Sequence, residues 1–305
     1  MIFLDAQAIA ARHEPRALIE ALARAFTGDI TAPPRGHHAL GATEDDGTLL
    51  VMPAWRAGGG IGVKMVAVLP RNRARGKPTV DGGYMLLGDD AAPRAILDAK
   101  MLTLIRTAAV SALAASRLAD PQARTMLMVG AGALAPHLIR AHAAVRGLQR
   151  IMIWSRRPEQ ARDLAQTLRA EGLPTEAVAD LAAGQIEAQI VSCATLSIGP
   201  LVRGRRLAPG VHLDLVGGFR PDMREADDDA VRRARVVADS RSALQEAGDL
   251  SQPVASGVLD PARVVDLSAL LRGAPAEPGA YDITLFKSVG TAIADFATAE
   301  HLLSR

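Results

Sequence analysis

An apolar run that leads into a glycine turn constrains the fold of this chain more than any other part of its sequence. Residues 125–135 read TMLMVGAGALA, which predicts a strand, a tight turn and the start of a helix whose N–H groups would face an anion. Gly130 permits the turn, and Gly132 removes the Cβ that would keep the backbone away from a pyrophosphate. A glycine turn alone is equally typical of an ordinary helix start, so its context decides. The predicted dinucleotide-binding turn comprises Gly130, Ala131, Gly132, Ala133 and Leu134.

The residues after the next apolar run indicate which dinucleotide binds. Residues 150–154 (RIMIW) predict a second parallel strand, with a helix-compatible stretch at 134–146 before it. NAD enzymes commonly place Asp or Glu after this strand to bind the ribose hydroxyls, whereas this chain has Ser155, Arg156 and Arg157. A hydroxyl and two guanidinium groups would bind a 2′-phosphate, so we expect NADP(H) to be preferred, with NAD(H) as the alternative. The other interpretation is that the two arginines belong to a solvated helix start.

The composition excludes several classes of function. The chain has 35 basic and 33 acidic residues and only 3% aromatic residues, which leaves neither a basic field nor stacking platforms for nucleic acid. Hydrophobic residues make up 49%, yet no run approaches the length of a membrane span, and the N-terminus lacks the pattern of a secretory signal. Cys193 is the single cysteine and the seven histidines are not spaced as a ligand set, so we expect no disulfide and no metal site. These observations predict a cytoplasmic protein that binds neither nucleic acid nor a membrane.

Strand-like and helix-like runs alternate through the second half of the chain, as a parallel sheet requires. Strands are predicted there at 125–129, 150–154, 175–178, 189–194, 211–216 and 235–238. The first half instead predicts helices at 15–27 and 102–118 and strands at 49–52, 62–68, 84–87 and 95–97, and a last helix is predicted at 291–303. The predicted fold class is α/β, with a Rossmann-type doubly wound parallel sheet plus an α+β domain.

Six short stretches, in the same order along the chain, resemble the ornithine cyclodeaminase/μ-crystallin family. The most specific of them joins the block RTAA at 106–109 to the glycine turn. The six are 62–66 (GVKMV), 105–114 (IRTAAVSALA), 130–132 (GAG), 216–225 (VGGFRPDMRE), 247–249 (AGD) and 285–290 (LFKSVG). The resemblance implies a homodimer with two domains in each chain. Residues 1–118 with 291–305 would form the substrate-binding and dimerisation domain, and residues 119–290 the Rossmann dinucleotide-binding domain.

By the same resemblance, Arg35, Lys64 and Arg106 correspond to three cations that bind a substrate carboxylate, and Lys64 and Arg106 count as catalytic. A planar guanidinium can bind a carboxylate through two charge-assisted hydrogen bonds, and a lysine adds an adjustable point charge. Lys64 interrupts an apolar strand, where an unpaired ammonium would be costly to bury. The alternative is that each cation snorkels to solvent or forms a structural ion pair.

The resemblance also implies further contacts with the cofactor. Thr107 follows the carboxylate-binding arginine, and Thr195 follows the fourth predicted strand of the parallel sheet. Lys287 and Ser288 resemble the stretch that closes over the nicotinamide. Each of these four residues could instead be an ordinary loop or capping residue.

Two positions depart from the ornithine cyclodeaminases of this family. Those enzymes carry an aspartate after the Gly-Gly of the later motif and a glutamate two residues before a Met-Pro pair. This chain has Phe219 and Leu50 at the corresponding positions, and neither can transfer a proton or bind a distal amine. The chain is therefore more similar to the ketimine reductase branch. That branch would reduce Δ1-pyrroline-2-carboxylate or Δ1-piperideine-2-carboxylate to L-proline or L-pipecolate, with Phe219 against the methylenes of the substrate.

Three alternatives to this imine reductase remain at this point. The chain could be an ornithine cyclodeaminase that releases ammonia, an amino-acid dehydrogenase of the same family, or a non-catalytic NADPH-binding protein like the crystallins. The proton donor of the reduction is also open, with Asp222, Asp227 and a bound water as candidates. Glu225 is expected to serve the fold, by capping or pairing near the helix around Asp227.

Overall fold

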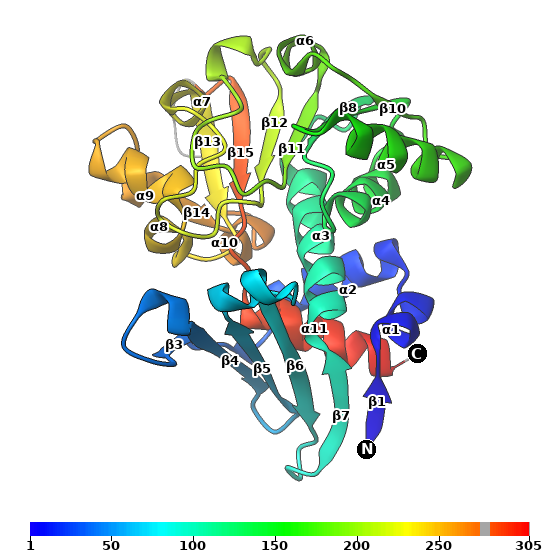
Figure 1. The fold of residues 1–305 in the computed structure, drawn as a ribbon, viewed down its shortest axis with the longest axis vertical. Helices are drawn as coiled ribbons and strands as arrows, with labels where there is room; N and C mark the ends of the chain where they lie inside the picture. Colours follow the sequence, from blue (N-terminus) through cyan, green and yellow to red (C-terminus); the bar gives the residue numbers. More distant parts are fainter. Residues whose placement is uncertain (275–280, 305) are drawn as a thin grey trace. The chain divides into compact units, whose positions relative to one another are not determined.

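The chain divides into two compact units in a computed structural model that describes residues 1–274 and 281–304 (Figure 1). Unit 1 comprises residues 1–106 and the C-terminal residues from 291, and unit 2 comprises residues 107–290. The boundary falls inside helix α3 (Ala99–Leu118), whereas the sequence placed it at the end of this helix. An uninterrupted helix gives no change of composition at such a point. Beyond Arg106 its residues pack within unit 2, where Ser111 bonds to a buried strand residue, Asp214.

Unit 2 is built on a sheet of eight strands, all parallel, in the order β10-β9-β8-β11-β12-β15-β13-β14. The predicted Rossmann-type doubly wound sheet is therefore confirmed. The strands are β8 (Thr125–Val129), β9 (Arg150–Trp154), β10 (Thr175–Ala177), β11 (Ile190–Cys193), β12 (His212–Leu215), β13 (Ala234–Ala238), β14 (Val265–Asp266) and β15 (Ile283–Lys287). The sequence prediction missed β14 and β15. The first is two residues long, and the second carries a polar threonine and a lysine within a short run.

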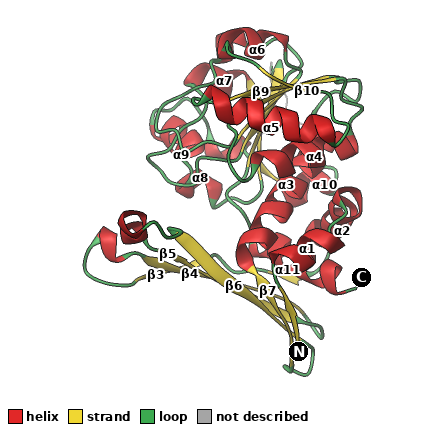
Figure 2. Cartoon of the chain, turned by 45° about the vertical axis from the view of Figure 1, so that its right-hand side comes forward, coloured by secondary structure: helices red, strands yellow, loops and turns green. Residues whose placement is uncertain are grey.

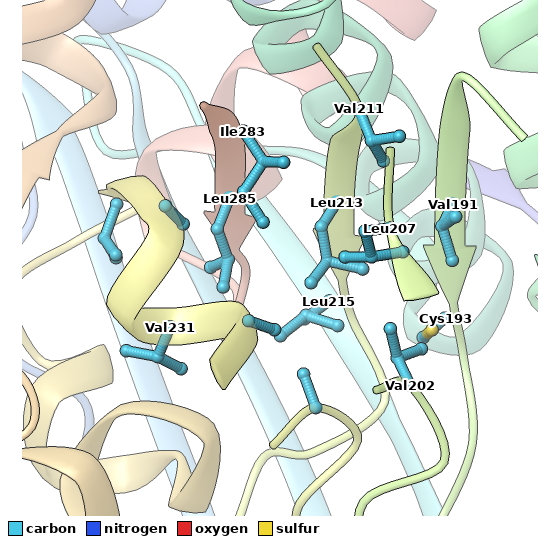
Figure 3. Close-up of a cluster of buried hydrophobic side chains, with 14 of the residues drawn as sticks. Val191, Cys193, Val202, Leu207, Val211, Leu213, Leu215, Val231, Ile283 and Leu285 are labelled. Atoms are coloured by element: carbon cyan, nitrogen blue, oxygen red, sulfur yellow. The ribbon is translucent and has the colours of Figure 1, made fainter. Parts of the chain in front are cut away.

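Helices cover both faces of this sheet. They are α4 (Ala135–Val145), α5 (Pro158–Ala170), α6 (Leu181–Glu187), α7 (Asp228–Arg233), α8 (Ala243–Glu246), α9 (Gly248–Ala255) and α10 (Leu267–Leu271), with short 3-10 turns at Gly204–Arg206 and Pro261–Arg263. On one face, alternate strand residues such as Val191, Leu213 and Leu285 pack with Val231 of α7 in one buried cluster (Figure 3). This apolar cluster stabilises the strand ends from which the site loops leave.

The other face of the same sheet carries a buried polar network instead of a purely apolar contact. Asp214 of β12 accepts hydrogen bonds from Ser111 of α3 (2.9 Å) and Ser192 of β11 (2.6 Å), and it lies 3.2 Å from Nε2 of His142 on α4. All four side chains are fully buried. The network therefore ties α3 and α4 to the middle of the sheet.

Unit 1 contains a seven-stranded sheet in the order β1-β7-β6-β5-β4-β2, with β3 paired to β4. Its strands are β1 (Ile2–Leu4), β2 (Ile30–Thr31), β3 (Gly36–Ala39), β4 (Thr48–Arg56), β5 (Ile61–Val68), β6 (Val80–Leu87) and β7 (Pro93–Asp98). Its helices are α1 (Ala6–Arg12), α2 (Pro15–Thr27) and α11 (Ala292–Leu303), with 3-10 turns at Glu44–Asp46 and Pro70–Arg75. Helix α2 buries Leu18, Leu22 and Phe26, the face that its spacing predicts. Helix α11 packs against α2 and across β4, β5 and β6 (Figure 2).

Helix α3 is the one described helix that is long and apolar enough to cross a membrane, which the sequence prediction overlooked. Two thirds of its most apolar stretch, 67%, is buried within the protein. The core helix of a soluble protein has the same length and composition, so this finding is weak evidence for a membrane span.

Candidate active site

The glycine turn after β8 has the geometry that a dinucleotide requires. Gly130 has φ +114°, and a Cβ there would lie 2.7 Å from the carbonyl oxygen of Ala194, so no other residue fits without strain. At Gly132 a Cβ would meet nothing within 4 Å, so the backbone lies open on that side. Helix α4 begins at Ala135, directly after the turn. Its N-cap residue is Leu134, and no side chain accepts a hydrogen bond from its first N–H groups. The uncapped N–H groups and the open backbone fit a pyrophosphate.

A pocket of about 180 Å³ adjoins this turn in unit 2. It brings together Gly130, the three residues after β9 and the loop after β11. The sequence names residues at these positions as cofactor-binding, and that role stays a prediction. Arg156 and Arg157 are exposed, and Oγ of Ser155 accepts a hydrogen bond from the N–H of Arg157 (3.3 Å). The pocket is lined by Gly130, Trp154, Ser155, Arg156, Arg157, Gln160, Ala194, Thr195, Leu196, Ser197 and Leu201.

One buried carboxylate, Glu225, connects the loop after β11 to the loop after β12. Its Oε1 accepts hydrogen bonds from the N–H and the hydroxyl of Thr195 (both 2.7 Å), and its Oε2 accepts from the N–H groups of Gly217 (2.8 Å) and Gly218 (3.4 Å). Burial raises the pKa of Glu225, and Lys287 opposes that shift. Glu225 was expected to stabilise the fold. In the structure it holds the loop after β11 and the loop after β12 in place, and the second of these loops leads to Phe219.

Lys287 and Ser288 have other partners than the sequence led us to expect. The ammonium of Lys287 is fully buried and pairs with Asp249 at 3.0 Å. The hydroxyl of Ser288 donates to Oδ2 of Asp239 (2.8 Å), which also accepts from the N–H of Gly290 (2.6 Å). Both side chains thus bond within the interior of unit 2. The signal for this was present in the sequence, since a lysine at the end of the run ITLF needs a buried counter-charge.

In unit 1, Lys64 and Arg106 meet on one carboxylate. Nζ of Lys64 lies 2.8 Å from Oδ2 of Asp295, and Nε of Arg106 donates to Oδ1 of the same residue at 2.8 Å. Lys64 is 3% exposed, Arg106 5% and Asp295 0%. Arg35, just before β3, acts electrostatically on Lys64, whereas the contacts with Asp295 are made by the other two predicted cations.

The strand register explains how this cluster is placed. Met52 of β4 and Tyr84 of β6 flank Lys64 of β5 in register, so all three side chains lie on the sheet face that α11 covers. Leu50, two residues before Met52, lies on this face as well. The predicted substrate residue Leu50 is therefore on the same face as the cations.

The charges of the cluster shift one another. Burial lowers the pKa of Lys64 to about 8, and the positive charges of Arg106 and Arg35 add to this, whereas Asp295 opposes it. Burial acts to raise the pKa of Asp295, but Lys64 and Arg106 outweigh it and the pKa is lowered. Lys64 is thus an ammonium that can lose its proton near neutral pH, beside a carboxylate that stays ionised.

Comparisons with known proteins agree with this geometry. The profile of the ornithine cyclodeaminase/mu-crystallin family matches residues 7–305. A Δ1-pyrroline-2-carboxylate reductase of Paracoccus denitrificans is 42% identical over 261 residues, which cover 84% of this chain and 83% of that protein. The chain belongs to the ornithine cyclodeaminase/mu-crystallin family. The resemblance that six short motifs indicated is therefore confirmed.

Two solved structures of this family are also similar to the chain. The Δ1-pyrroline-2-carboxylate reductase of Thermococcus litoralis, in complex with NADH and L-proline, matches with a TM-score of 0.91 and 28% identity over 100% of this chain and 97% of that one. A probable ornithine cyclodeaminase from Bordetella pertussis matches with a TM-score of 0.86 and 30% identity over 99% and 96% of the two chains. Both branches of the family thus share the fold, and individual residues must distinguish them.

Phe219 is one of the two residues that differ from the cyclodeaminase branch. Phe219 follows the glycines that Glu225 binds and is 45% exposed. The two aspartates considered as proton donors have other tasks. Asp222 is exposed and pairs with Arg220 (2.6 Å), and Asp227 caps α7 by accepting from the N–H of Ala230 (3.1 Å).

Asp295 is the site residue that sequence reasoning missed. Its signal was a single acidic residue in the otherwise apolar first turns of the last helix, TAIADFA. A buried carboxylate on an apolar face requires a cation. Only the packing of α11 on β5 identifies which cations those are.

Proposed function

We propose that this family member reduces the cyclic imino acid Δ1-pyrroline-2-carboxylate to L-proline with a nicotinamide cofactor. The observation that carries the proposal is the buried pairing of Lys64 and Arg106 on Asp295. Two cations against one carboxylate leave positive charge for a second, substrate carboxylate. The relatives named Δ1-pyrroline-2-carboxylate reductase support this choice of substrate class.

The reduction requires a hydride at the imine carbon and a proton at the imine nitrogen. A bound nicotinamide supplies the hydride. Asp295 accepts from Nε of Arg106, and the terminal nitrogens of the guanidinium then serve the substrate carboxylate. Lys64, with a pKa of about 8, is protonated at neutral pH and supplies the proton to nitrogen. Phe219 cannot transfer a proton, which agrees with a reaction that needs no second acid or base.

Steady-state oxidation of NADPH and NADH by the purified protein tests this function. Δ1-Pyrroline-2-carboxylate is compared with the six-membered Δ1-piperideine-2-carboxylate, and ornithine with catalytic NAD⁺ serves as the competing reaction. We expect rapid turnover of at least one imino acid and no ammonia from ornithine. Ammonia release without imine reduction would assign the cyclodeaminase activity instead. Cofactor binding without either reaction would assign a non-catalytic role.

We further propose that NADP(H) is preferred over NAD(H). The support is the exposed guanidinium groups of Arg156 and Arg157 at the pocket beside the glycine turn, in a position without a carboxylate. Arg156→Ala should lower the NADPH to NADH ratio of kcat/KM by about ten- to a hundredfold, the loss of a charge-assisted contact of about 1.5–3 kcal/mol. Arg162→Ala, an exposed arginine on α5 outside the pocket, is the matched control. An unchanged ratio for Arg156→Ala would refute the preference.

A homodimer is the proposed oligomeric state. Helix α11 covers one face of the unit 1 sheet, and the opposite face carries apolar side chains that remain half-buried or exposed, including Trp55 (36% exposed) and Met65 (44%). Alternate residues of β4 and β5, such as Val51 and Val63, extend this apolar face. A second copy of the same face would bury it. Light scattering after size exclusion should give the mass of two chains, and the mass of one chain would refute the dimer.

A further inference from the structure

Asp295 is the one carboxylate that the structure shows in contact with both Lys64 and Arg106 among the described residues. Its two oxygens divide the work, since Oδ2 pairs with the ammonium of Lys64 and Oδ1 accepts from Nε of Arg106, each at 2.8 Å. The three side chains come from β5, α3 and α11, and Asp295 itself is fully buried. A contact of this kind fixes both cations relative to each other.

The charge of Asp295 matters as much as its hydrogen bonds. Burial and the neighbouring guanidinium groups of Arg106 and Arg35 all favour the neutral amine of Lys64. Asp295 is the opposing influence, and it also orients the guanidinium through Nε, leaving the fork of terminal nitrogens for a bidentate contact. A carboxylate in this position therefore decides the protonation of one cation and the direction of the other.

We propose, building on the imine reductase function above, that Asp295 is a positioning residue that keeps Lys64 protonated and directs the terminal nitrogens of Arg106 toward the substrate carboxylate. Asp295 does not touch the substrate in this arrangement. It acts through Lys64, which donates the proton to the imine nitrogen and regains one from solvent in each turnover, and through Arg106. The C-terminal helix thereby becomes part of the catalytic machinery.

Every charged or titratable group around Lys64 bears on this proposal. Asp295 comes from α11, Arg106 from α3 and Arg35 from the segment before β3. Tyr84 of β6 is opposite Lys64 in register, and burial raises its pKa well above the ordinary value, so it stays neutral. Glu300, further along α11, acts on Tyr84 and pairs with Arg56 at 3.2 Å. Asp295 is therefore the negative charge whose removal Lys64 should sense most strongly.

Direct titration of Lys64 tests the proposal without any use of activity. The chain has only four lysines, Lys64, Lys77, Lys100 and Lys287, so a sample labelled with ¹³C at lysine Cε gives few signals, and Lys64→Arg assigns the one of interest. In the unmodified protein we expect that signal to titrate near pH 8. In Asp295→Asn the midpoint should fall by about 1–3 units, the usual influence of a close opposite charge. An unchanged or higher midpoint would refute the proposal.

The pH profile of imino-acid reduction provides the second readout. If protonated Lys64 is required, kcat/KM declines as the pH rises through about 8, and this alkaline limb moves to lower pH in Asp295→Asn. A fall of one unit in the midpoint leaves roughly a tenth of Lys64 protonated at pH 8 instead of half, about a fivefold loss of kcat/KM. Glu300→Gln, on the same helix in an exposed ion pair, should change neither the midpoint nor the profile.

Two further results keep the outcomes separate. Asp295→Glu retains the negative charge but displaces it by one methylene. It should keep the titration midpoint of Lys64 within about half a unit and raise KM for the imino acid. If Asp295→Asn does not fold, Asp295→Glu takes its place in the titration. A midpoint in Asp295→Glu lowered as far as by loss of the charge would then refute the proposal. A protein in which Asp295→Asn lowers the midpoint but no imino acid is reduced would overturn the proposed function and leave the electrostatic link intact.

Discussion

Replacement of the lysine at the end of β15 distinguishes a cofactor contact from a structural ion pair. The family resemblance placed Lys287 in the stretch that closes over the nicotinamide, whereas the structure shows its ammonium fully buried on Asp249 at 3.0 Å. Asp249 also accepts hydrogen bonds from the N–H groups of Glu225 (2.7 Å) and Ala226 (3.2 Å) through its other oxygen. Lys287→Met therefore leaves two buried carboxylates, Asp249 and Glu225, without their cation.

The expected cost follows from this geometry. Removal of one partner from a buried ion pair costs about 3–5 kcal/mol, because the remaining charge stays desolvated. For a unit of the size of residues 107–290, each kcal/mol lowers Tm by roughly 2–4 °C, which gives a fall on the order of 10 °C. Lys287 lowers the pKa of Glu225, so its loss raises that pKa further above the unfolded value. Above a pH of about 4.5, Glu225 in the folded variant keeps a proton that it loses in the unfolded chain. The stability lost by the variant relative to the parent protein therefore grows as the pH rises above that value.

Differential scanning calorimetry at pH 5.5 and pH 8, with a fluorescence titration of NADPH well below Tm, measures both effects. Lys287→Met should lower Tm at both pH values, more at pH 8, and change the Kd for NADPH by less than about threefold. Lys100→Met, an exposed lysine on α3, is the matched control. The double variant Lys287→Met/Asp249→Asn should recover part of the lost Tm, since it removes both charges. A Tm within about 1 °C of the parent protein, together with a Kd weakened more than tenfold, would show that Lys287 binds the cofactor.

The glycine turn and the loop brace yield two more predictions. Gly130→Ala should lower the free energy of unfolding by about 1–3 kcal/mol, because φ of Gly130 is +114° and the new Cβ would lie 2.7 Å from the carbonyl oxygen of Ala194. Gly132→Ala has open space around its Cβ, so it should keep Tm and weaken NADPH binding. Equal losses of Tm in the two variants would contradict this prediction. Glu225→Gln replaces one of two carboxylate oxygens that accept buried N–H groups, so it should cost about 1–3 kcal/mol in denaturant unfolding and weaken NADPH binding. An unchanged Kd for NADPH in Glu225→Gln would show that the hydrogen bonds of Glu225 do not affect cofactor binding.

Much of the fold was legible in the sequence because it rests on local rules. The first two strands of the parallel sheet match their predicted bounds, 125–129 and 150–154, since each is a continuous apolar run before a turn. Helix α2 matches its predicted bounds, Pro15–Thr27, because its apolar residues recur at helical spacing after a proline. The structure divides the two units within α3 and not at its end, because no local signal changes inside an uninterrupted helix.

The sequence by itself determined the glycine turn, the absence of a carboxylate after β9 and the replacement of the cyclodeaminase carboxylates by Phe219 and Leu50. These are properties of single residues and their immediate neighbours, so no partner has to be known. Only the tertiary structure decided that Lys64 and Arg106 share Asp295 and that Lys287 pairs with Asp249. The energy of a buried charge depends on which opposite charge the fold brings within hydrogen-bond distance. These partners are far apart along the chain, by 38 residues for Lys287 and Asp249 and by 189 residues for Arg106 and Asp295.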